Sequence, residues 1–153
     1  MKYQEKYPMQ EFGREDPVWV DRILDWRWTW LLARTAMVVI FLVSAILKSL
    51  DFHAAVLEQE EMGLHPGAFW AGLTIAVQGI GSLLVISGRF VWLGAGALGV
   101  FTAIAAVMAH GFWTLEGQER FVAMNVFLEH MGLIGGLVMT ALVAEHAKRE
   151  GRP

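Results

Sequence analysis

The chain contains 153 residues, of which 56% are hydrophobic and only 18% charged. An average soluble domain carries roughly 25% charged residues, and disordered chains carry more, so this composition excludes disorder. The net charge of −3 argues against a nucleic-acid partner, which requires a clustered basic surface. The sequence has no cysteine, which excludes disulfides, thiolate catalysis and cysteine-ligated metal sites.

The N-terminal segment, residues 1–29, is too rich in charges to be a signal peptide, which needs an apolar stretch. The pair Asp16-Pro17 is typical of a helix start. Apolar side chains then recur at helical spacing, at Trp19, Ile23, Trp26 and Trp30. We therefore predict a short amphipathic helix that lies on the membrane surface and leads into the first span.

Four long stretches of the remaining chain lack Asp, Glu, Lys and Arg: residues 35–47, 62–88, 90–115 and 130–144. A membrane-spanning helix needs about 20 mainly apolar residues. We predict an all-α integral membrane protein with four transmembrane helices, at about 30–50, 68–87, 91–110 and 121–144. The connection between the second and third helices is very short, which favours an up-and-down bundle. A short tail, residues 145–153, follows the bundle.

The distribution of basic residues predicts the orientation of these helices. Ten of the twelve Lys and Arg residues fall in the N-terminal part up to Arg34, at Arg89, or in the tail, all on one side of the membrane. The loops on the other side contain only Lys48 and Arg120. Both termini are therefore expected in the cytoplasm, with the protein in a bacterial inner membrane.

Small residues spaced four apart let transmembrane helices approach closely. The sequence contains three such groups: Gly72 with Ala76, Ala95 with Gly99 and Ala103, and Gly132 with Gly136. They predict a compact four-helix bundle, packed within one chain or between chains.

Several polar side chains lie inside the predicted spans, where an ionisable group costs about 2.5–3.5 kcal/mol on insertion scales. The direction of each helix places five of them in the outer half of the bundle: Lys48, Gln78, His110, Asn125 and Glu129. Asn125 and Glu129 share one helix face because they are four residues apart, and we expect both to face the bundle interior. Arg34 and Lys48 are alternatively explained by long side chains that extend to the membrane surface. No two histidines share a helix face at ligand spacing, so we predict no metal or haem site.

The residues from Arg34 to Ala144 resemble the DoxX family of four-span membrane proteins. The resemblance rests on an ordered set of features: Arg34, the Lys48-Ser49-Leu50-Asp51-Phe52 run, Gln78 before Gly79-Ile80-Gly81, His110 and Asn125. The family usually has a glutamate where this chain has Gln78, so hydrogen bonding rather than proton transfer is expected at that position. The resemblance implies association with membrane redox systems, since one related protein type is a subunit of a thiosulfate:quinone oxidoreductase.

Two functions from different classes follow from these observations. In the first, the chain is a quinone-interacting subunit whose polar cluster supplies hydrogen bonds to the quinone, with Glu129 exchanging a proton. In the second, it is a non-catalytic anchor or assembly subunit of a larger oxidoreductase, and its outer loops dock the partner. Lipid and a protein subunit or second copy are the expected partners. A small-solute transporter is a weaker third hypothesis because the chain lacks an internal inverted repeat.

Overall fold

The computed structural model describes residues 17–24, 26–109 and 111–149. These residues form helices connected by short turns, and the bounds of the helices are α1 (Val18–Leu24), α2 (Arg27–Leu50), α3 (Phe52–Glu61), α4 (Gly67–Ser87), α5 (Val91–Ala109), η1 (Phe112–Thr114) and α6 (Gly117–Arg149). Four of them, α2, α4, α5 and α6, are long and apolar enough to cross a membrane. The predicted all-α fold with four transmembrane helices is therefore confirmed.

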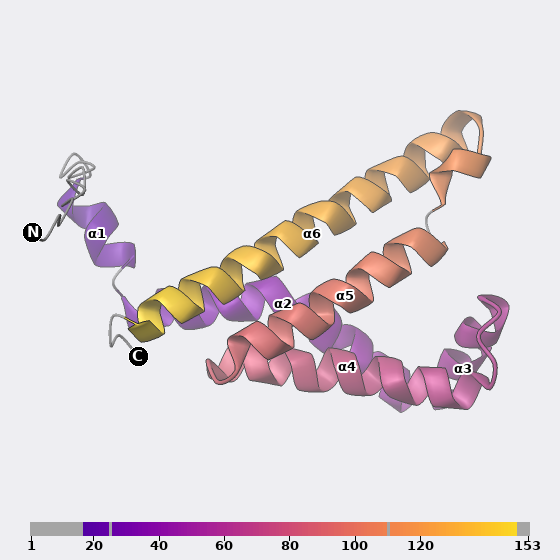
Figure 1. Cartoon of the computed structure of the whole chain (residues 1–153), viewed down its shortest axis with the longest axis horizontal. Helices are drawn as coiled ribbons and strands as arrows, with labels where there is room; N and C mark the ends of the chain where they lie inside the picture. The colour runs from indigo at the N-terminus through magenta and orange to yellow at the C-terminus, as the bar shows by residue number, and fades with distance from the viewer. Residues whose placement is uncertain (1–16, 25, 110, 150–153) are drawn as a thin grey trace, which may run out of the picture.

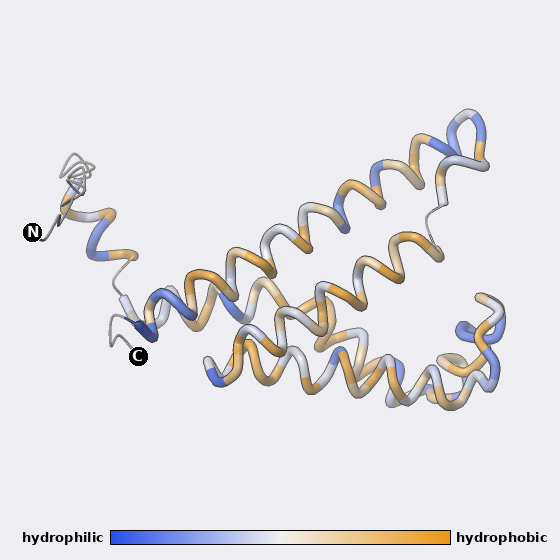
Figure 2. Tube along the Cα trace, in the orientation of Figure 1, coloured by the Kyte–Doolittle hydropathy of each residue, from blue (hydrophilic) through white to orange (hydrophobic). Residues whose placement is uncertain are grey.

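The four long helices run alternately up and down, so α1 and the C-terminal end of α6 lie at one end of the molecule (Figure 1). This end is referred to below as the α1 end, and the opposite end, with α3 and η1, as the α3 end. Hydrophilic residues gather at the two ends and along α3, whereas the segments between them are mainly apolar (Figure 2).

The bundle is closed at the α1 end and open at the α3 end. Helices α2 and α6 touch only sparsely, while α4 packs on both α2 and α5, and α5 packs on α6. Figure 1 shows α6 diverging from α2 and α4 toward the α3 end. The predicted compact bundle is therefore correct only for the α1 half, and the α3 half opens between α2 and α6.

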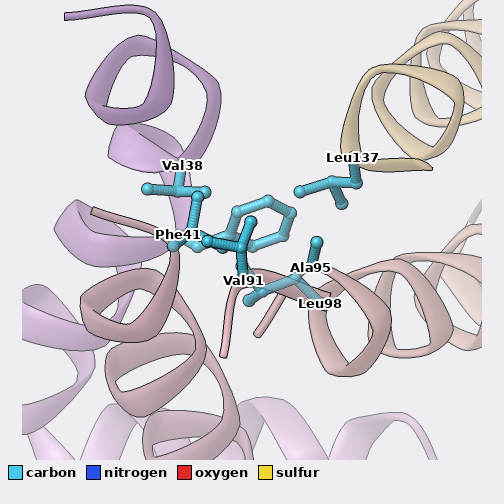
Figure 3. Packing of buried hydrophobic residues seen from close by; sticks show 7 residues of the cluster. Val38, Phe41, Val91, Ala95, Leu98 and Leu137 are labelled. Atoms are coloured by element: carbon cyan, nitrogen blue, oxygen red, sulfur yellow. The ribbon is translucent and has the colours of Figure 1, made fainter. Parts of the chain in front are cut away.

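The core lies where all four long helices are still close together. The Phe41 ring from α2 is 5% exposed and packs among apolar side chains from α4, α5 and α6 (Figure 3). The other fully or nearly fully buried members of this cluster are Val38, Val85, Val91, Ala95, Leu98 and Leu137. Leu137 is the fully buried member of this cluster from α6, and Leu133, Ala141 and Ala144 of the same helix pack against it.

The backbones of α4 and α5 approach each other closely at two glycines. A Cβ atom on Gly94 would lie 2.6 Å from the Gly81 carbonyl oxygen, so only glycine fits there. Of the small residues predicted to pack, Ala95 is buried, whereas Gly72, Gly99 and Gly132 have open space where a side chain would be. Of the predicted glycines, Gly136 does lie against another helix, beside the Met37 side chain of α2, whereas the close Gly81–Gly94 contact was not predicted because these two glycines lie on different helices.

Helix α3 was not predicted and replaces the expected loop between the first two spans. It starts at Asp51, whose carboxylate accepts a hydrogen bond from the Ala54 amide at 3.0 Å, as helix N-caps do. Its buried face includes Gln59. A Cβ atom added to Gly67, at the start of α4, would lie only 2.5 Å from Cγ of Glu60. Helix α3 is therefore held against the start of α4.

A short helix does precede the first span, but it is not continuous with it. Trp26 has an extended backbone and begins α2, so Trp19 and Ile23 of α1 do not share one helix with Trp26 and Trp30. Trp19, Ile23 and Trp26 are each more than half exposed. The predicted apolar stripe is therefore divided between two helices.

Candidate functional site

Lys48 lies at the α3 end of α2 and forms an ion pair with Glu58 of α3. The lysine side chain is 17% exposed and the glutamate side chain 51% exposed. Sequence reasoning missed Glu58 because α3 was expected to be a loop. The Lys48 ammonium is therefore used to hold α3 against α2, and it does not simply extend to the membrane surface.

Gln78 lies in the middle of α4 and is only 5% exposed. Among the described residues, its Oε1 atom is buried without a hydrogen-bond donor. Thr74 and Ser82, one turn away on either side, are also buried, and the Ser82 hydroxyl donates to the Val38 carbonyl of α2 at 3.5 Å. Helix α4 therefore presents a buried polar stripe toward α2, with an unpaired acceptor at its centre.

Asn125 is half-buried and Glu129 is exposed, both in the half of α6 that diverges from α2. The hydrophilic positions in this half interrupt an otherwise apolar helix (Figure 2). Glu129 is therefore not covered by another helix in the described part of the chain, and the expectation that it faces the bundle interior stays a prediction.

The direction of these two side chains follows from a contact nearer the α1 end. A Cβ on Gly136 would collide with the Met37 side chain, so this side of α6 faces α2. Glu129 and Asn125 precede Gly136 by seven and eleven residues, which is about two and three helical turns. They consequently point to the α2 side of α6, into the opening.

Lys48 occupies the matching position on the opposite helix, because it follows Met37 by eleven residues on α2. Lys48 is paired with Glu58 of α3, whereas Glu129 is exposed on α6, so the structure does not bring the two into one closed pocket. Gln78 lies in the α4 stripe, and His110 lies outside the described residues. The five predicted site residues are therefore not assembled into a single cluster, and their binding of a ligand stays a prediction.

Two further polar residues of the spans have local partners. The Arg34 guanidinium lies 5.8 Å from the Trp30 ring centroid and against the turn at Gly88. The His130 ring donates from Nδ1 to the Val126 carbonyl at 2.7 Å. Within the described ranges, no three His, Asp or Glu side chains are grouped so as to hold a metal ion.

The family model described as DoxX matches residues 29–111, more than half of the chain. The chain belongs to the DoxX family. The match in this DoxX protein covers α2 through α5 and ends before α6, so Asn125 and Glu129 lie outside the matched part. Searches of curated proteins and of solved structures found no significant match.

Proposed function

We propose that this DoxX protein is a non-catalytic membrane subunit of a larger redox assembly in the bacterial inner membrane, with both termini in the cytoplasm. The redox association comes from the family resemblance. The observation that supports a subunit role is the exposure of Glu129 within a transmembrane helix.

Lipid chains offer no hydrogen bonds, so a carboxyl group exposed to them is unfavourable and usually faces protein or water. A transmembrane segment of a partner that carries hydrogen-bond donors would satisfy both Glu129 and Asn125. The same segment would cover the apolar side chains that α6 leaves exposed near them, such as Val122 and Leu128.

Helices α2 and α6 make few contacts with each other, and their backbones diverge toward the α3 end, which leaves room for such a segment beside α6. The opening between them is closed near the core by the contact of Met37 with the Gly136 region and widens toward the α3 end. A partner helix entering from the α3 end would pack against the α2-facing side of α6. Helix α3, which Lys48 and Glu58 fix to α2, would form the opposite rim.

Site-specific photo-crosslinking in native membranes tests this proposal. A photoreactive residue in place of Asn125 should give a discrete adduct that contains a subunit of a membrane oxidoreductase, identified by mass spectrometry. The matched control places the same residue at Ile104, which is 56% exposed on α5, and should give lipid adducts only. Adducts at position 125 that contain only lipid would contradict the proposal.

A second candidate function, interaction with a quinone, is favoured by the buried Gln78 acceptor. A quinol hydroxyl could donate a hydrogen bond to Oε1, which has no donor among the described residues. Quinone extracted from the purified wild type in stoichiometric amount, and lost from Gln78→Leu, would support this function. Absence of quinone from the wild type purified in mild detergent would argue against it.

A further inference from the structure

A cavity of about 680 Å³ lies at the α1 end, between α2 and α6 and away from the opening described above. Trp30 lines it from α2, and α6 supplies the remaining lining residues: Leu142, Val143, Glu145, His146, Ala147 and Arg149. This volume lies within the range of roughly 300–1,000 Å³ that small-molecule sites occupy.

The lining of the cavity changes from apolar to polar along α6. Leu142 and Val143 are exposed apolar residues on the side toward the membrane centre, and Glu145 and Arg149 follow in the last turns of the helix. Trp30 lies near the start of α2, at the depth where tryptophans prefer the boundary between lipid chains and headgroups. A ligand with an apolar tail and a polar head therefore fits this site in one orientation.

The charges in the cavity match a headgroup that carries both signs. The Arg149 Nε donates to Glu145 Oε1 at 3.3 Å, which leaves the terminal N–H groups of the guanidinium directed elsewhere. These donors suit a phosphate, which arginine binds with charge-assisted hydrogen bonds. Glu145 and the carbonyl groups at the C-terminal end of α6 suit a cation, because this end of a helix carries partial negative charge.

We propose that this cavity binds a phospholipid with a primary-amine headgroup, of the phosphatidylethanolamine type, from the leaflet at the α1 end. The phosphate contacts Arg149, the ammonium contacts Glu145, and one acyl chain lies along Leu142 and Val143. Glu145 lines the cavity beside the basic Arg149 and His146, and its carboxylate favours a headgroup that carries an ammonium over a purely anionic one. The site is independent of the partner-binding role proposed for the other half of α6.

Native mass spectrometry of the purified chain with defined lipids tests the proposal. Phosphatidylethanolamine should be retained more strongly than phosphatidylcholine, whose trimethylated amine donates no hydrogen bond to Glu145, and more strongly than phosphatidylglycerol. Arg149→Gln and Glu145→Gln should each weaken retention about tenfold or more, since a hydrogen bond to a charged group contributes about 1.5–3 kcal/mol. Both residues lie at an exposed helix end, so the variants are expected to fold.

Arg89→Gln is the matched control, because Arg89 is an exposed arginine at the same end that does not line the cavity. Its lipid retention should equal that of the wild type. Equal losses for Arg89→Gln and Arg149→Gln, or equal retention of all three lipids, would overturn the proposal. Displacement of the lipid by soluble phosphoethanolamine at similar concentration would show a headgroup-only site and would also overturn it.

Discussion

Gln78 has an amide in the core of the membrane domain whose oxygen is buried and without a donor among the described residues. A buried polar atom without a partner costs about 1–3 kcal/mol, whereas an apolar side chain of similar shape avoids this cost. Ser82, one turn away, does have a partner in the Val38 carbonyl. The two neighbouring positions are therefore expected to respond in opposite ways to an apolar substitution.

We predict that Gln78→Leu leaves the stability of the purified protein unchanged or raises it, by up to about 3 kcal/mol. Ser82→Ala should instead lower stability by about 1 kcal/mol because it removes a hydrogen bond. Thermal unfolding of both variants in the same detergent measures this. A marked loss of stability in Gln78→Leu would mean that the amide oxygen has a bonding partner after all.

At the scale of the helices, the packing of α4 on α5 depends on two glycines. A methyl group at Gly94 would meet the Gly81 carbonyl oxygen at 2.6 Å and the Leu84 Cβ at 2.9 Å, neither of which can move without the helix. At Gly99, on the same helix, a methyl group would meet nothing within 4 Å. The two positions form a matched pair for testing the interface.

Gly94→Ala should destabilise the bundle by about 1–3 kcal/mol, the usual cost of overpacking a well-packed interface. Gly99→Ala should be neutral or slightly stabilising, because alanine is the better helix former. The midpoints of unfolding of the two variants, measured side by side, give the comparison. Similar midpoints would show that α4 and α5 are not in close contact.

The sequence predicts the four transmembrane helices well and helix α3 poorly, for a physical reason. Charge-free runs gave the four spans to within a few residues, because exclusion of charges depends on the membrane alone. Helix α3 was missed although Asp51 is a recognisable N-cap residue, since the segment was treated only as the connection between two spans. The exposure of Glu129 could not be predicted, because hydropathy places a residue in the membrane without indicating which helix covers it.

At the scale of the whole molecule, the even number of spans places α1 and the C-terminal end of α6 at the same end. The excess of basic residues at this end predicts that it faces the cytoplasm. A C-terminal fusion to a fluorescent protein that folds only in the cytoplasm should therefore be active. A fusion inserted at Gly63, in the turn between α3 and α4, to an enzyme active only in the periplasm should also be active, and the reverse result for both fusions would contradict the orientation.

The membrane domain is closed at the α1 end, and α2 and α6 diverge toward the α3 end. Both the exposure of Glu129 and the proposed partner site depend on this shape. The absence of cysteine from the sequence allows spin labels to be attached at chosen pairs of exposed positions without background labelling.

Pulsed electron paramagnetic resonance on the purified chain in lipid nanodiscs measures the opening directly. One pair of labels, at Ile40 and Met139, spans α2 and α6 near the core, and a second pair, at Leu47 and Val122, spans them toward the α3 end; all four side chains are exposed. The structure predicts a clearly longer distance for the Leu47–Val122 pair than for the Ile40–Met139 pair. Equal distances for the two pairs would mean that α6 packs along the whole of α2, and would contradict the open shape.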